Sequence, residues 1–249
     1  LRRLSGSKRL RWPCTIAARC LSPGASLRVA PPRACRLLLA RQRYEDMNAE
    51  PAFLRSGELM SVGETALVVV DVQERLLPVI AGRTRLVWNI GRLIEGARIL
   101  GIPVAATEQY PQGLGPTVPE LARRLGPIPS KRMFSCRGCP EVFQELQAQG
   151  IHKFLVCGIE AHVCVQQTVL DLLGAGWRVY VAADAVGSRH EVDYEFALRR
   201  MESAGAILTT TEAALFEWCE TAGTPQFKEI SRLVRQSPPA EADQRDGMP

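Results

Sequence analysis

The stretch Ala66-Leu-Val-Val-Val-Asp71 decides the fold of this chain. It is a short aliphatic, mostly β-branched run, which is typical of a strand buried on both faces of a parallel sheet. Apolar residues follow at helical spacing from Leu86 to Ala97, and Gly101 ends the helix that they predict. A buried strand followed by a helix indicates an α/β unit.

The alternation of strands and helices continues to about residue 219. Further strands are predicted at 102–106, 153–157, 177–183 and 206–209, with a short extended stretch at 128–130. Helices are predicted at about 140–149, 162–173, 191–204 and 212–219. Strands separated by helices of this length form βαβ units with right-handed crossovers. The sequence therefore predicts an α/β fold, a three-layer αβα sandwich around about six mostly parallel strands, as in Rossmann-like proteins.

The positive net charge comes from the N-terminal segment. The 249 residues include 31 Lys and Arg against 26 Asp and Glu, a formal net charge of +5. Residues 1–44 hold eleven of the basic residues and no acidic one, which leaves 20 basic and 26 acidic residues for the remainder. An acidic domain gives no support for nucleic-acid binding. The apolar runs are also far shorter than the ~20 residues that a membrane-spanning helix needs.

Composition divides the chain into three regions. Residues 1–59 are predicted to form a basic, disordered extension, 60–236 a single folded domain, and 237–249 a disordered tail. The scattered cysteines of the domain suggest a reducing compartment, so we expect a cytoplasmic protein. A mitochondrial location is the alternative if residues 1–46 are a transit peptide. A start at Met47, with the preceding segment not part of the natural protein, is equally open.

Three reactive side chains follow predicted strands. Asp71 ends the first strand, Lys131 follows the stretch at 128–130, and Cys164 lies in the first turn after the strand at 153–157. Ligands bind at the carboxyl ends of the strands of an open parallel sheet, where these side chains can converge. A nearby cation favours a thiolate, and a carboxylate can accept and return its proton. Taken singly, each has an ordinary explanation: a capping Asp, a solvated Lys and an inert buried Cys.

Three stretches resemble the isochorismatase-like hydrolases, the superfamily that includes nicotinamidases, N-carbamoylsarcosine amidase and isochorismatase. They are Ala66-Leu-Val-Val-Val-Asp-Val-Gln-Glu74, Pro129-Ser-Lys-Arg-Met-Phe-Ser135 and Gly158-Ile-Glu-Ala-His-Val-Cys-Val165. The most similar subgroup is that of the isochorismatase domain-containing proteins, whose Thr-Glu-Gln-Tyr-Pro-x-Gly-Leu-Gly loop is similar to residues 107–115. The resemblance covers about residues 60–236. It implies an isochorismatase-like fold, a hydrolase of C–N bonds, and a homo-oligomer that is a dimer or larger.

The resemblance also implies roles for single residues. Cys164 would be the acylated nucleophile, Asp71 the proton acceptor, and Lys131 the group that steadies both charges. The family usually has a non-proline cis peptide four residues before its cysteine, here Ile159–Glu160. This peptide would direct the N–H of Glu160, together with that of Cys164, at the oxyanion.

The residues around the predicted site include candidates for a substrate pocket. They do not include the motif of a metal site. The substrate-pocket candidates are Gln73, Glu108, Gln109, Tyr110 and His162. Nicotinamidases carry an Asp-x-His metal motif where this chain has Glu-Gln-Tyr, and its three histidines do not stand at metal-ligand spacing. We therefore expect no metal, no cofactor, and a small amide or carbamoyl substrate rather than nicotinamide. The expected partner is this small molecule, with neither nucleic acid nor membrane.

Two other interpretations remain open. Cys136-Arg-Gly-Cys139 is a Cys-x-x-Cys pair before a predicted helix, which would suit a dithiol redox protein. The chain is alternatively a non-catalytic ligand-binding member of the fold, because a fold does not fix a function. The identity of the substrate follows from none of these residues.

Overall fold

The fold is built around a sheet whose six strands all run parallel. The computed structural model describes residues 55–240. The strands are β1 (Thr65–Val70), β2 (Val104–Gln109), β3 (Ser130–Lys131), β4 (Lys153–Ile159), β5 (Arg178–Gly187) and β6 (Ile207–Thr209). Their order in the sheet is β3-β2-β1-β4-β5-β6. The predicted α/β class with a six-stranded parallel sheet is therefore confirmed.

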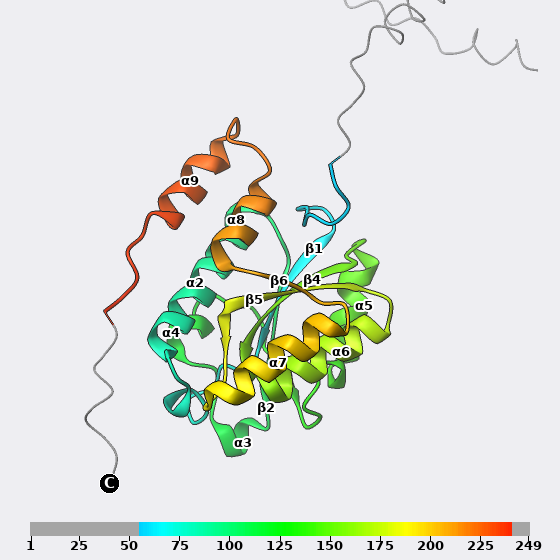
Figure 1. Cartoon of the computed structure of the whole chain (residues 1–249), viewed down its shortest axis with the longest axis vertical. Helices are drawn as coiled ribbons and strands as arrows, with labels where there is room; N and C mark the ends of the chain where they lie inside the picture. Colours follow the sequence, from blue (N-terminus) through cyan, green and yellow to red (C-terminus); the bar gives the residue numbers. More distant parts are fainter. Residues whose placement is uncertain (1–54, 241–249) are drawn as a thin grey trace, which may run out of the picture. The chain divides into compact units, whose positions relative to one another are not determined.

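Helices cover both faces of the sheet (Figure 1). Because side chains alternate along a strand, Leu67 and Val69 of β1 point to one face, and Ala66 and Val68 point to the other. The first face packs against α2 (Arg83–Leu100), α8 (Thr211–Cys219) and α9 (Pro225–Val234). The second face packs against α5 (Pro140–Ala148), α6 (Gln166–Gly174) and α7 (Glu191–Ser203). The three predicted layers are present, and each face has its own apolar core.

The strand order places a topological switch point between β1 and β4. The chain winds from β1 to β2 and β3 on one side, then crosses to β4 on the other side of β1. Ligands of open parallel sheets bind in the crevice at the carboxyl ends of the strands next to such a point. The segment after β1 contains Asp71, and the segment after β4 contains Cys164.

Gly158 allows the chain to leave β4 close to the end of β1. Its φ is +122°, and a Cβ built on it would lie 2.1 Å from the backbone oxygen of Val70. A residue with a side chain would clash with β1 and would also be strained at this φ. Glycine here therefore brings the segment before Cys164 directly beside the end of β1.

Five short helical segments lie in the connections. They are η2 (Leu77–Val79), α3 (Pro111–Leu114), α4 (Pro119–Ala122), η3 (Cys136–Gly138) and η4 (Ala161–Val165). The sequence predicted an α-helix starting at about 162, whereas η4 is a π-helical turn and α6 begins at Gln166. In this turn Val165 donates to Glu160 O at 3.2 Å. Cys164 thus lies in a π turn, a feature often found at functional sites.

The fifth strand is longer than predicted, and α9 is a ten-residue helix that the sequence pattern did not predict. β5 ends at Gly187 instead of 183, because its pairing with β4 shifts register between Val156 and Gly158. Asp184 lies in the shifted part and accepts hydrogen bonds from the Thr211 backbone and hydroxyl. A carboxylate in mid-strand is a poor strand former, which is why the sequence pattern ended there.

The ends of the described chain pack against the domain in part. Arg55 donates to the backbone oxygens of Met60 and Glu217, both at 2.6 Å, and Met60 is fully buried. The predicted extension lies outside the described residues up to residue 54, so its boundary at 59 stays a prediction, as does that of the tail at 237. None of the helices within residues 55–240 combines the length and the apolar character needed to cross a membrane.

Candidate active site

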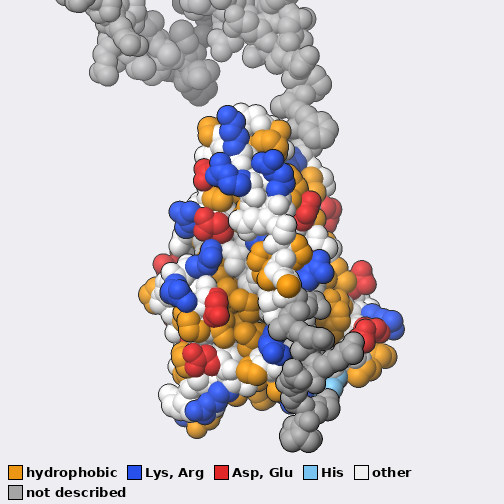
Figure 2. All heavy atoms as spheres, turned by 90° about the vertical axis from the view of Figure 1, so that its left-hand side faces the viewer, with side chains coloured by type: hydrophobic (Ala, Val, Ile, Leu, Met, Phe, Trp, Pro, Cys, Tyr) orange, Lys and Arg blue, Asp and Glu red, His pale blue; other side chains and the backbone are white. Residues whose placement is uncertain are grey.

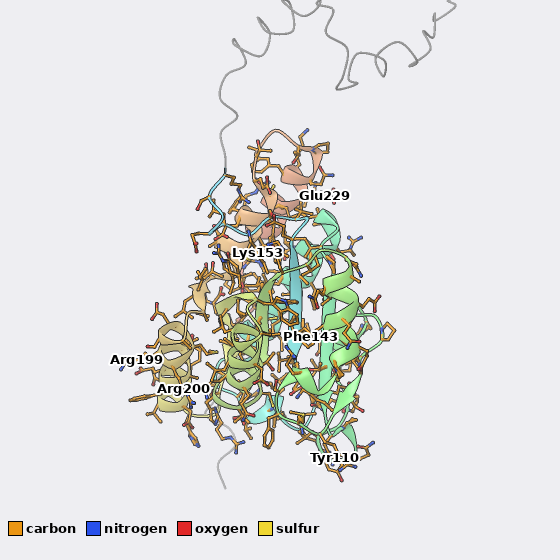
Figure 3. All side chains as sticks on the ribbon, turned by 90° about the vertical axis from the view of Figure 1, so that its right-hand side faces the viewer. Tyr110, Phe143, Lys153, Arg199, Arg200 and Glu229 are labelled. Atoms are coloured by element: carbon orange, nitrogen blue, oxygen red, sulfur yellow. The ribbon has the colours of Figure 1, made fainter. Side chains whose placement is uncertain are left out.

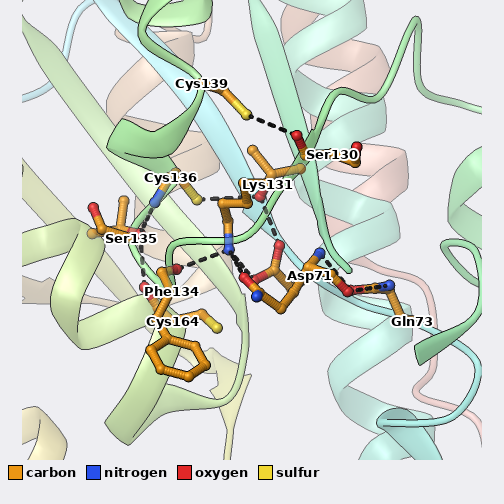
Figure 4. Close-up of polar contacts among 12 residues, drawn as sticks. Asp71, Gln73, Ser130, Lys131, Phe134, Ser135, Cys136, Cys139 and Cys164 are labelled. Carbon is orange, nitrogen blue, oxygen red and sulfur yellow. Dashed lines mark hydrogen bonds and ion pairs between the residues drawn. The ribbon is translucent and has the colours of Figure 1, made fainter. Parts of the chain in front are cut away.

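Asp71 and Lys131 form a buried ion pair at the carboxyl edge of the sheet. Lys131 Nζ lies 2.6 Å from Asp71 Oδ2, and both side chains are completely inaccessible. The ammonium also donates to Gln109 Oε1 at 2.9 Å and to the Phe134 backbone oxygen at 2.8 Å. All three of its protons therefore have acceptors, as a buried ammonium requires. Figure 4 shows these contacts.

The Asp71 carboxylate is held at both oxygens. Its Oδ1 accepts a hydrogen bond of 2.8 Å from the Thr107 hydroxyl at the end of β2. The Asp71 backbone has a φ of +51°, a left-handed conformation that Asp adopts more readily than most residues. This turn takes Asp71 out of the β1 direction, and the two bonds fix the orientation of its carboxylate.

Cys164 lies at the same edge, with its side chain only 4% exposed. Burial raises the pKa of its thiol well above the ordinary value; the Asp71 carboxylate raises it further, and Lys131 lowers it. The Cys164 backbone oxygen accepts a 2.7 Å bond from Thr168, whose hydroxyl in turn accepts from the Cys136 N–H at 2.9 Å. The raised pKa keeps the Cys164 thiol protonated at neutral pH.

Glu160 precedes the cysteine turn, and its side chain binds Arg189. The peptide bond between Ile159 and Glu160 is cis. The Glu160 carboxylate accepts two bonds from the Arg189 guanidinium, at 2.9 and 2.8 Å, which hold the pKa of Glu160 below its usual value. The side chain therefore fixes this segment to the start of α7 and leaves the backbone as the part that can face the site.

Two of the pocket candidates hold the loop after β2. Gln73 is fully buried; its amide donates to Gln109 O at 3.0 Å and Gly115 O at 2.6 Å, and its oxygen accepts from Gln109 N. Glu108 Oε1 accepts from the Thr117 N–H and hydroxyl at 2.6 and 2.8 Å. Both side chains bind backbone within the protein, so they shape the rim.

The other candidates differ in position. Gln109 binds Lys131 with its oxygen and Arg132 O with its amide. Tyr110 is 43% exposed, with the Arg132 guanidinium 5.1 Å from its ring. Figure 3 places Tyr110 where the strands end, opposite Lys153 at the start of β4. His162 Nδ1 lies 3.0 Å from the Ser188 hydroxyl.

Sequence reasoning missed Thr107 and the neighbourhood of Cys136. Cys136 Sγ lies 3.2 Å from the Thr107 hydroxyl, and burial raises the pKa of this thiol to about 11. The signal for Thr107 was available, because parallel pairing with β1 puts it opposite Val70, next to Asp71. All five cysteines of residues 55–240 are free thiols.

Two grooves of the molecule lie away from these residues. One of about 710 Å³ runs between α2, α4 and α9, and another of about 530 Å³ lies between the start of α2 and the end of β5. Neither is lined by Asp71, Lys131 or Cys164. Within the described part of the chain, no group of His, Cys, Asp and Glu side chains is arranged to hold a metal ion.

Residues 65–213 match the family described as Isochorismatase domain. This chain belongs to the isochorismatase family. The bovine "Isochorismatase domain-containing protein 2" is 45% identical over 179 residues, which cover 71% of this chain and 86% of that protein. The resemblance of the sequence to isochorismatase-like proteins is thereby confirmed.

Solved structures of the isochorismatase fold are also similar to this chain. The "MAR1 Ribonuclease" of Caenorhabditis elegans is 42% identical, with a TM-score of 0.68 over 73% of this chain and 95% of that one. The YcaC gene product of Escherichia coli, described as "an octameric hydrolase of unknown specificity", is 23% identical with a TM-score of 0.65, covering 73% of this chain and 91% of that one. The latter likeness concerns the fold alone.

Proposed function

We propose that this isochorismatase-family protein is a cysteine hydrolase of small amide or carbamoyl compounds. Cys164 is the nucleophile, Asp71 its base, and Lys131 the cation that steadies both. The observation that carries the proposal is the fully buried Asp71–Lys131 pair at 2.6 Å, at the sheet edge where the Cys164 thiol also lies. A buried pair is weak evidence for stability, whereas beside a thiol it has a chemical use.

The reaction begins with proton transfer from the Cys164 thiol to Asp71. The sulfur then forms a bond to the acyl carbon, and the carbonyl oxygen becomes an oxyanion, which the N–H groups of Glu160 and Cys164 stabilise. Asp71 returns the proton to the leaving amine as the C–N bond breaks. Water then attacks the acyl-cysteine, with Asp71 as its base, and releases the acid and the thiol.

The electrostatics of the site support this assignment. The raised pKa of Cys164 means that little free thiolate exists at rest, so attack requires a base in contact with the thiol. Asp71 supplies that base, and Lys131 offsets its charge as the proton moves. Gln73, Glu108, Gln109, Tyr110 and His162 are proposed to shape the pocket, as the contacts of the first three with the rim and with Lys131 suggest.

The protein is proposed to form a homo-oligomer. The octameric assembly in the description of the E. coli neighbour supports a homo-oligomer here. Ribonuclease activity, which the name of the C. elegans neighbour carries, is not proposed for this chain. The face turned to the viewer in Figure 2 mixes basic, acidic and hydrophobic side chains. A cytoplasmic location stays a prediction, with the mitochondrial one as its alternative.

Trapping the acyl-cysteine tests the proposal. The purified chain is incubated with a metabolite extract, and peptides are examined by mass spectrometry for an acyl adduct on Cys164. Cys164→Ala should abolish adduct and turnover while the fold is kept, and Asp71→Asn should slow acylation at least ~100-fold. Cys139→Ala is the matched control and should leave the adduct unchanged. Full turnover by Cys164→Ala would refute the mechanism, and loss of activity on changing Cys139 alone would favour the dithiol alternative.

A further inference from the structure

Two exposed apolar side chains lie beside the candidate site. Met133 and Phe134, in the loop between β3 and η3, are 59% and 51% exposed. The loop is tied to the site, because Lys131 Nζ donates to the Phe134 backbone oxygen at 2.8 Å. In the view of Figure 4 the Phe134 side chain and Cys164 lie on the same side of Lys131. Large apolar side chains exposed at the mouth of a site are typical of ligand contacts.

The charges around the thiol are already engaged. Asp71 and Lys131 are the charged groups that act on Cys164, and they neutralise each other. The Glu160 carboxylate, which belongs to the residue directly before η4, accepts two hydrogen bonds from Arg189. A carboxylate or ammonium brought to this site would lose its hydration without gaining an unpaired counter-charge in the buried part.

The core behind the thiol is also apolar. Cys164 shares its core cluster with Ala161, Val165 and Cys136, all completely buried. Arg132, the cation of the same loop as Phe134, lies over the Tyr110 ring at 5.1 Å. The surroundings therefore suit a neutral group that brings apolar surface with it.

We infer that the substrate is uncharged and that its acyl group carries an apolar substituent, which Phe134 receives. This inference deepens the proposed function and rests on it. Phe134 is thus a specificity-determining residue, whose ring covers the substituent while Cys164 attacks. A partly exposed contact of this kind gives a preference of about five- to tenfold, at the lower end of what hydrophobic pockets achieve.

Alkylating probes test the inference without knowledge of the substrate. Iodoacetamide and iodoacetate have nearly the same size, but only the second carries a charge. With either probe the Cys164 sulfur displaces iodide, a C–S bond replaces the C–I bond, and the thiol proton passes to Asp71. Labelling of Cys164 in the full chain is followed by peptide mass spectrometry, and each rate is divided by that of glutathione with the same probe.

The expected order of normalised rates is N-butyl-iodoacetamide, iodoacetamide, then iodoacetate, with steps of about five- to tenfold. Phe134→Ala should reduce the ratio of the first two rates to about one, and Phe134→Leu should keep it above about three. Phe196→Ala is the matched control, because Phe196 is 61% exposed on α7 and should leave the ratio unchanged. Equal rates for iodoacetate and iodoacetamide would overturn the inference.

The outcomes separate this inference from the proposed function. If Cys164 is labelled no faster than the other four cysteines of the domain, the proposed function fails, and the inference fails with it. If Cys164 is labelled fastest but without preference among the probes, only the inference fails. If Phe134→Ala keeps the preference and instead changes the molecular mass by light scattering, the ring belongs to an interface with a second copy, and the inference is again wrong.

Discussion

Replacing Lys131 with methionine measures how much free energy of unfolding is lost when the buried Asp71 carboxylate is left without its counter-charge. Methionine keeps an unbranched apolar stem and removes the ammonium. The Asp71 carboxylate then keeps the 2.8 Å bond from Thr107 and loses the 2.6 Å bond to Lys131, at a position without solvent access. Gln109 Oε1 and the Phe134 backbone oxygen lose their donor as well.

The expected loss is large because a buried charge is left without its counter-charge. Removing one partner of a buried pair lowers the free energy of unfolding by about 3–5 kcal/mol. For a folded part of this size, each kcal/mol lowers Tm by about 2–4 °C, so Tm should fall by about 6–20 °C. The double variant Asp71→Asn/Lys131→Met removes both charges, and its unfolding free energy should fall by only about 1–2 kcal/mol.

Urea unfolding followed by circular dichroism measures the free energy of unfolding of Lys131→Met, of Asp71→Asn and of the double variant. Lys228→Met, an exposed lysine of α9, is the matched control and should change the free energy of unfolding by less than about 0.5 kcal/mol. A loss below about 1 kcal/mol for Lys131→Met would refute the reasoning. So would a double variant whose loss equals the sum of the two single losses, because the partners would then be independent.

Three further perturbations test other parts of the site. Thr107→Val should slow alkylation of Cys164 by iodoacetamide about tenfold, because the Asp71 carboxylate loses the bond that orients it, and Thr107→Ser should restore the rate. Gly158→Ala should lower the free energy of unfolding by about 2–4 kcal/mol in urea titrations, with Gly174→Ala, where a Cβ meets nothing within 4 Å, as the control. The pKa of Glu160 is lowered in the folded protein, so the ionised carboxylate stabilises the fold at a pH above its ordinary pKa of 4.5. This contribution is lost as the pH falls through the lowered pKa. Arg189→Met should therefore flatten the pH dependence of the free energy of unfolding between about pH 5 and 3.

The strands that carry the site could be predicted where their own residues are apolar and therefore indicate burial. In β1 every residue is buried, and its aliphatic run has no other stable environment than the centre of a sheet. β5 was cut short because Asp184 interrupts its apolar pattern, and the partners of that carboxylate, Thr211 and Asn89, come from distant parts of the sequence. A local pattern contains no information on such partners.

The same distinction holds for the site. Asp71, Lys131 and Cys164 were singled out by their places after predicted strands together with the resemblance to the isochorismatase-like hydrolases, and the first two form an ion pair at that edge of the sheet. The tasks of Gln73 and Glu108 were not predictable, because each binds backbone atoms of a loop whose path the sequence does not fix. The local sequence therefore does not tell which backbone groups a polar side chain near a predicted site will bind.

The hydrogen-bond chain at Asp71 also bears on the dithiol alternative. Thr107 has one hydroxyl proton and donates it to the Asp71 carboxylate, so at 3.2 Å the Cys136 thiol must be the donor to the Thr107 oxygen. Cys136 can hold this position only while it keeps its proton, and its pKa of about 11 meets that condition at neutral pH. A dithiol enzyme needs a thiolate near neutral pH, whereas the Cys136 thiol keeps its proton there and uses it to donate to Thr107. The contacts of Cys136 thus favour a second role, that of holding the base for Cys164, over a redox role of its own.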